Sequence, residues 1–154
     1  MKAEFVNPIY RAASDVLKSM LELDVKRGNL ARGDELISGN EANVAIGVTG
    51  DLSGSILFSF DRDMAISMVE SMSGMEVDEL DKFVTSALGE VANIISGNAA
   101  TFLQNEGYDC DIVPPRVIIG ENKSLSMATD TVLIIPLHTE MGEFDINLAI
   151  WANS

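Results

Sequence analysis

The sequence predicts an α+β protein in which long helices pack on a mainly antiparallel sheet. Two pairs of segments alternate apolar and polar residues around a turn, as hairpin strands do, and three other segments have the three-and-four apolar spacing of amphipathic helices. The order of helix, short strands and hairpin occurs twice, once up to Phe60 and again from Asp78, which indicates an internal duplication. At this length we expect residues 1–154 to form one domain that needs no disulfide or structural metal.

The first half is expected to begin with a helix. Asn7 can cap the free N–H groups, and Pro8 suits the first helical position because no hydrogen bond is lost there. The apolar spacing of a helix continues to about Leu23. A less regular segment, 25–38, should then hold a strand and a loop.

A hairpin and a second helix should complete this half. The alternating segments Asn43–Gly50 and Gly54–Phe60 predict the two strands of the hairpin. Asp61 is expected to cap a helix that runs to Ser73 and ends at Gly74.

The second half begins with the longest helical pattern, from Asp78 to Gln104. Short strands are expected after it, broken by two prolines, and the closing hairpin is the strongest strand pair in the sequence. The predicted strands are Tyr108–Val113, Val117–Ile119, Leu125–Ala128, Thr131–Thr139 and Phe144–Trp151. Pro136 cannot donate to a strand ladder, which predicts an edge strand or a bulge there. His138 is interpreted as a strand-surface residue, because nothing near it in the sequence suits catalysis.

Composition excludes several classes of function. The formal net charge of -14 makes nucleic acid and anionic membranes unfavourable partners. Cys110 is the single cysteine, so an internal disulfide is impossible and a cysteine-based zinc site lacks ligands. The first residues do not resemble a secretory signal, and no apolar run approaches the ~20 residues of a membrane helix. We therefore expect a cytoplasmic protein.

Candidate functional residues lie on the long helix, on the side away from its apolar stripe. Glu90 and Asn93 are three residues apart and share this face, with Ser86 before them and Gly97 after. Gly89 and Gly97 each destabilise a helix by on the order of 1 kcal/mol relative to alanine, so their presence there needs an explanation. One reason is close approach of another protein surface. The alternative is packing of the glycines against a sheet, with Glu90 and Asn93 as ordinary solvated residues.

This helix resembles that of the CheC/CheX/FliY phosphatases of bacterial chemotaxis. The resemblance rests on Ser86, on Glu90 after three residues and on Asn93 after two, with a proline that Pro114 or Pro115 could supply. The duplicated order of elements also resembles the pseudo-symmetric CheC-like fold. The other Glu-x-x-Asn match, at residues 4–7, precedes the expected helix and is interpreted as accidental. A single motif is similar to the single-site CheX members, which implies a homodimer.

The resemblance implies a protein phosphatase whose substrate is the aspartyl phosphate of a CheY-type response regulator. Asn93 would position the attacking water, and Glu90 would pair with the receiver's lysine. Partner contacts are implied for four further residues, Ser86, Gly89, Gly97 and Pro115. No metal or cofactor is expected on this chain, because Mg²⁺ belongs to the receiver. The alternative function is a non-enzymatic interaction module similar to the flagellar switch proteins, and a small-molecule enzyme has little support.

Overall fold

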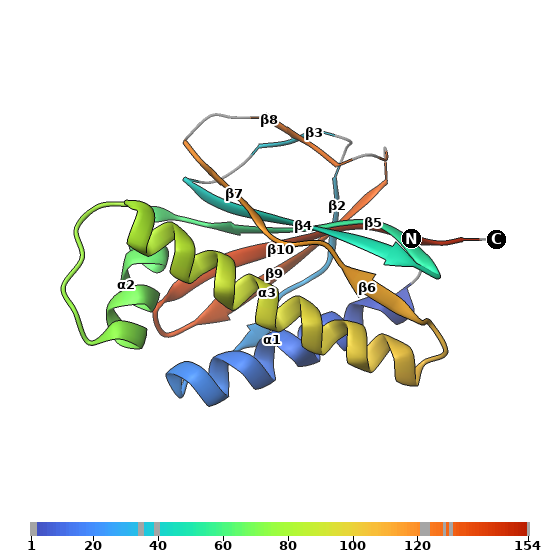
Figure 1. The fold of residues 1–154 in the computed structure, drawn as a ribbon, viewed down its shortest axis with the longest axis horizontal. Coiled ribbons are helices and arrows are strands. Elements are labelled where there is room, and N and C mark those ends of the chain that lie inside the picture. The colour runs from blue at the N-terminus through green and yellow to red at the C-terminus, as the bar shows by residue number, and fades with distance from the viewer. Residues whose placement is uncertain are drawn as a thin grey trace.

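The computed structural model describes residues 3–33, 36–38, 41–120, 124–127, 129 and 131–153. Its elements are shown in Figure 1. The helical elements are the 3-10 turn η1 (Ala3–Phe5) and the helices α1 (Val6–Leu21), α2 (Arg62–Ser73) and α3 (Lys82–Asn105). The strands of the first half are β1 (Lys26–Arg27), β2 (Ala31–Gly33), β3 (Leu36–Ser38), β4 (Ala42–Gly50) and β5 (Leu52–Phe60). Those of the second half are β6 (Cys110–Ile112), β7 (Arg116–Ile119), β8 (Ser124–Ser126), β9 (Val132–Thr139) and β10 (Gly142–Ala152).

The strand pairing has an internal two-fold symmetry. The large sheet has the order β1-β9-β10-β5-β4-β6, with β2 also on β9 and β7 also on β4. If each strand number is raised by five, counting on from β10 to β1, the pairing of β1 and β2 with β9 becomes the pairing of β6 and β7 with β4. The central pair β5 and β10 and the separate ribbon β3 and β8 each map onto themselves. The predicted α+β fold and its duplicated order are therefore confirmed.

The two faces of the large sheet are covered differently. The helices lie on one face, and the β3–β8 ribbon lies over the other (Figure 1). Alternation along β5 sends Ile56 and Phe58 into the main core with the helices. Leu57 points to the other face, where it packs with Ala149 and Met127 in a smaller cluster. No helix in the described part of the chain is long and apolar enough to cross a membrane.

The start of α1 differs from the prediction. The helix begins at Val6 after the 3-10 turn, with Phe5 at its N-cap and no side-chain cap. Phe5 and Val6 are buried, so core packing draws this segment into helical geometry before Asn7. Asn7 therefore lies inside the first turn and does not cap it. Pro8 is still tolerated, because N–H groups of a first turn have no partner within the helix.

The hairpin and helix predicted from Asn43 to Gly74 are confirmed. Alternate residues of β4 and β5 belong to the main core, together with residues of the helices. The Asp61 carboxylate accepts from the Met64 N–H at 2.7 Å and caps α2. Gly74 ends α2 with a φ of 71°, the left-handed conformation that favours glycine.

The start of α3 is corrected from Asp78 to Lys82. Asp81 is the N-cap, and its carboxylate accepts from the Val84 N–H at 3.0 Å. The backbone carbonyl of Asp78, which a longer helix would need for its first turn, accepts from the Arg62 guanidinium instead. A contact with α2 thus holds the residues before the cap out of the helix.

Pro136 lies inside the sheet, so of the two predicted alternatives the edge strand is wrong and the bulge describes the structure: three residues, 28–30, lie opposite two residues of β9, Ile135 and Pro136. β9 is flanked by β10 on one side and by β1 and β2 on the other. The Pro136 carbonyl accepts from the Gly28 N–H at 2.8 Å, in the break between β1 and β2. In an antiparallel pair, the nitrogen and the carbonyl of one residue point toward the same neighbouring strand. The nitrogen of Pro136, which carries no hydrogen, therefore also faces this break, where no regular ladder hydrogen bond is lost.

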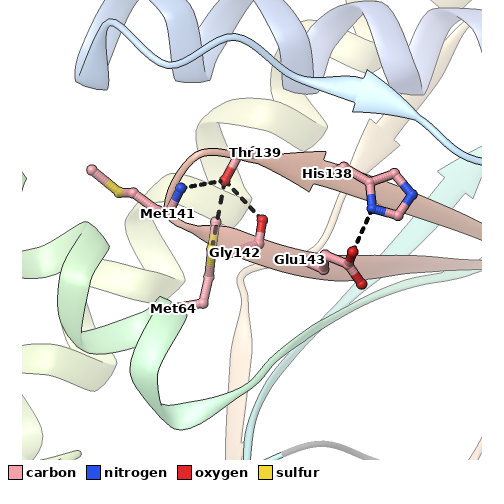
Figure 2. A network of polar contacts seen from close by, with 6 residues as sticks. All are labelled: Met64, His138, Thr139, Met141, Gly142 and Glu143. Carbon is pink, nitrogen blue, oxygen red and sulfur yellow. Dashed lines mark hydrogen bonds and ion pairs between the residues drawn. The ribbon is translucent and has the colours of Figure 1, made fainter.

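The turn between β9 and β10 is tied to α2. The Thr139 hydroxyl donates to the Gly142 carbonyl at 2.8 Å and accepts from the Met141 N–H at 3.1 Å, and it lies 3.9 Å from the sulfur of Met64 (Figure 2). Met64 is fully buried in the main core, so this contact anchors the hairpin end on the helix.

Candidate functional site

The candidate site is an exposed stripe along α3. Its members recur at intervals of three or four residues and share a sector of about 80°. They are Phe83, Ser86, Glu90, Asn93 and Gly97. Phe83, Ser86 and Glu90 are exposed, and Asn93 and Gly97 are half-buried. The opposite side of the helix is buried in the main core, which holds the stripe toward the surface.

Glu90 and Asn93 lie side by side at the centre of this stripe. One helical step of three residues places them about 4.5 Å apart along the axis. Neither side chain has a hydrogen bond or ion pair to another residue in the part of the chain that the structure describes. Their polar atoms are therefore available to a partner molecule.

The charge on α3 contrasts with that of the whole chain. Glu90 is the only acidic residue of the 24-residue helix, and Lys82 is the only basic one. The chain as a whole contains 24 acidic and 10 basic residues. A helix without excess negative charge can approach a phosphorylated surface with less repulsion than the rest of this protein.

Gly89 lies beneath the stripe and faces the sheet. A Cβ built on Gly89 would lie 3.4 Å from Val117 Cγ2 and 3.7 Å from Pro115 Cγ. Gly89 is buried, so it lets α3 pack closely on β7 and the loop before it. Of the two prolines, Pro115 contacts this helix position and is half-buried, whereas Pro114 is exposed. For Gly89, the alternative of helix-on-sheet packing thus describes the structure.

Gly97 remains on the stripe, one turn beyond Asn93. A Cβ at Gly97 would come no closer than 4.0 Å to Ile112 Cδ1. Gly97 borders a hollow of about 400 Å³ between α3 and β6, whose lining includes Thr101, Asp109 and Cys110. Burial, followed by the nearby carboxylates of β6 and its flanks, raises the pKa of the Cys110 thiol. Cys110 is thus a buried thiol in an unreactive setting.

The second Glu-x-x-Asn match occupies the symmetry-related place on α1. The carbonyls of Leu17 and Leu103 each accept a hydrogen bond from a backbone N–H just beyond the C-terminal end of their helix, and the two residues are 86 positions apart. The same step relates residues 4 and 7 to Glu90 and Asn93. The match therefore lies at the place in the first half that corresponds to the α3 motif, and its interpretation as accidental stays a prediction.

The α1 copy differs from the α3 motif in its surroundings. Glu4 lies in the 3-10 turn and accepts a hydrogen bond from the Tyr108 hydroxyl, which raises the pKa of Tyr108. Arg11 stands at the place of Gly97, with its guanidinium 4.3 Å from the centre of the Phe102 ring. The open stripe of α3 is thus not repeated on α1.

Among the residues that the structure describes, titratable groups elsewhere do not form a catalytic cluster with α3. The ring of His138 lies 2.8 Å from the Glu143 carboxylate on the β9–β10 hairpin, and both side chains are solvent-exposed (Figure 2). Desolvation raises the pKa of Asp145 on the same hairpin, the Glu143 charge raises it further, and His138 lowers it. Among the described residues there is no group of three or more His, Cys, Asp or Glu arranged to hold a metal ion.

Sequence reasoning did not single out Phe83. This side chain is 45% exposed and stands seven residues before Glu90, on the same stripe. The spacing was visible in the sequence, but periodicity alone does not distinguish an exposed phenylalanine from a buried one.

The duplicated sheet and the motif on α3 define a protein of the CheC-like class. A solved CheC-like superfamily protein from Shewanella sp. PV-4 matches with a TM-score of 0.88 and 27% identity, covering 99% of this chain and 100% of that one. The CheX–CheY–BeF3–Mg²⁺ complex from Borrelia burgdorferi matches with a TM-score of 0.77 and 32% identity, over 97% of this chain and 99% of that one.

Within that class the comparisons specify one family. The family model "Chemotaxis phosphatase CheX" matches residues 42–138. The CheY-P phosphatase CheX of Thermotoga maritima is 29% identical over 152 residues, which cover 97% of each chain. The chain belongs to the CheX family of chemotaxis phosphatases and is accordingly a phosphatase, that is, a hydrolase.

Proposed function

We propose that this protein removes the aspartyl phosphate of a CheY-type response regulator. The observation that supports this most is the position of Glu90 and Asn93 on one face of α3, where Glu90 is exposed, Asn93 is half-buried and neither has a partner among the described residues. A relative is a CheY-P phosphatase, and another is solved in complex with CheY, BeF3 and Mg²⁺. The partner would therefore bring the phosphoryl group, the Mg²⁺ and its own lysine, and this chain would bind no metal or cofactor.

Asn93 is proposed to hold the attacking water. Phosphoryl transfer depends mainly on alignment and charge stabilisation, so a water placed in line behind the phosphorus supplies the missing component. The neutral amide of Asn93 can both donate to and accept from such a water. Because asparagine is a poor general base, its contribution is positioning and not proton abstraction.

Glu90 is proposed to place α3 on the receiver. Its carboxylate would repel phosphoryl oxygens if it entered the reaction centre directly, so its suitable partner is the receiver's lysine. Ser86 lies one turn before Glu90 and Gly97 one turn after Asn93, so both would lie at the contact surface. Gly97 would keep the helix low enough for close approach.

The alternative function is a non-enzymatic module that binds a receiver without catalysis. The test is release of phosphate from a phosphorylated CheY-type receiver of the same organism, measured with and without this protein, alongside binding to the receiver. The proposal predicts faster release at catalytic amounts of protein. Binding without acceleration would establish the interaction module and refute the catalytic role.

A homodimer is also proposed, on the strength of the single open motif per chain. The short edge strands β1 and β6 leave backbone groups that could pair with a second copy. Light scattering would measure the mass. A monomer at working concentration would refute this part.

A further inference from the structure

Phe83 is an apolar side chain in the first turn of α3 that is exposed at the surface. The Asp81 cap fixes the first turn of α3, so the place of Phe83 on the helix is well defined. Val77 and Leu80, in the connection just before it, pack against the main core. Phe83 instead remains 45% exposed. Its ring therefore contributes little to folding and is available to a partner.

The position of Phe83 relative to Glu90 limits what that partner can be. Seven residues of α-helix separate them, which is about 10.5 Å along the axis and about 20° around it. A standard interface buries about 800 Å² on each partner, equivalent to a disc of roughly 16 Å radius. A receiver centred on Glu90 and Asn93 would therefore cover Phe83.

The surroundings of Phe83 also fit an anchoring role. Aromatic side chains are enriched among the residues that dominate binding energy, because they bury a large area with few rotatable bonds. Lys82 is next to Phe83 in the first turn of α3, and Ser86 is one turn further on, so the ring is bordered by short or flexible polar groups. An apolar centre with a polar border is the usual arrangement of a binding hot spot.

We propose that Phe83 is a binding anchor that docks on an apolar spot of the receiver beside its phosphorylation site. This inference rests on the proposed function, because it takes the receiver to be the molecule that covers the stripe. Phe83 touches no reacting atom, so its effect is on the affinity of the encounter and not on the chemical step.

The test compares Phe83→Ala and Phe83→Leu with Trp151→Ala. Trp151 is 40% exposed near the end of β10 and projects from the face of the sheet opposite the helices, so it controls for loss of any exposed aromatic. Phosphate release gives kcat and KM, and calorimetry gives the affinity for a receiver loaded with beryllofluoride and Mg²⁺. Light scattering and urea denaturation check the mass and the fold.

For Phe83→Ala we expect KM and the dissociation constant to rise about tenfold with kcat unchanged within twofold, and a smaller rise for Phe83→Leu. Trp151→Ala should match wild type. An affinity within twofold of wild type for Phe83→Ala, an equal loss for Trp151→Ala, a loss confined to kcat, or a changed oligomeric mass would each overturn the inference. If wild type binds the loaded receiver without releasing phosphate faster, the proposed function fails while the affinities still decide the role of Phe83. If wild type does not bind the receiver, both fail.

Discussion

The two glycines of the α3 motif should respond differently to the same substitution. Gly89 faces the sheet and Gly97 faces outward on the stripe, yet both lie inside one helix. Replacing either with alanine adds one methyl group and removes the helix penalty of glycine. The pair therefore separates an effect on stability from an effect on binding.

The stability effect can be estimated from the contacts. A methyl at Gly89 would meet Val117 Cγ2 at 3.4 Å and Pro115 Cγ at 3.7 Å, which are ordinary van der Waals distances. A methyl at Gly97 would have its nearest neighbour, Ile112, at 4.0 Å. Neither change creates a clash, so each should stabilise the fold by about 1 kcal/mol, the difference in helix propensity. For a domain of this size, that raises Tm by about 2–4 °C.

The activity effect should appear only at Gly97. If α3 enters a cleft of the receiver, a methyl at this position intrudes on a close contact, and overpacking of about 1–3 kcal/mol lowers kcat/KM by roughly tenfold or more. Gly89→Ala should stay within twofold of wild type. The assays are urea and thermal denaturation for stability, and phosphate release from the phosphorylated receiver for activity.

Two results would refute this reasoning. Full activity of Gly97→Ala would show that the stripe does not need a low surface next to Asn93. A marked loss of stability in Gly89→Ala would show that α3 and β7 approach each other more closely than the distances in the structure allow.

Two further predictions concern stability. Asp81→Ala removes the cap of α3 and should lower the unfolding free energy by about 1 kcal/mol, while Asp81→Asn should retain most of it; equal losses in urea denaturation would contradict the cap. Asp145→Asn should stabilise the protein at neutral pH, because desolvation, followed by the Glu143 charge, raises the folded-state pKa of the carboxyl above its ordinary value of 3.8. The unfolded chain releases this proton first, so wild type loses stability relative to the variant as pH rises through 3.8 toward the folded pKa. A difference between variant and wild type that does not change with pH would refute it.

The sequence was most informative where local chemistry determines the structure. The helix α2 begins after Asp61 and ends at Gly74 as predicted, because a carboxylate cap and a left-handed glycine affect only the few residues next to them. The start of α3 was predicted wrongly because it depends on a contact with another helix. Arg62, in α2, donates a hydrogen bond to the Asp78 carbonyl. A tertiary contact of this kind has no signature in the spacing of apolar residues.

The candidate site shows the same division. The stripe of Glu90 and Asn93 follows from helical periodicity alone, and the structure places both on one accessible face. Periodicity could not tell that Gly89 is covered by Pro115, since that depends on a loop more than twenty residues further along the chain. It also could not relate residues 4–7 to the α3 motif, because the strand registers that reveal the two-fold symmetry lie outside both helices.

The most direct test of the proposed mechanism is kcat for Asn93→Ala on the phosphorylated receiver, with Asn7→Ala as the matched control. Asn7 holds the corresponding place in the first half but lies in the first turn of α1, so this control loses the same side chain outside the open stripe of α3. The mechanism predicts that Asn93→Ala binds the receiver normally while kcat falls about 10²- to 10³-fold, and that Asn7→Ala resembles wild type. Unchanged kcat for Asn93→Ala, or the same loss for both variants, would contradict water positioning by Asn93.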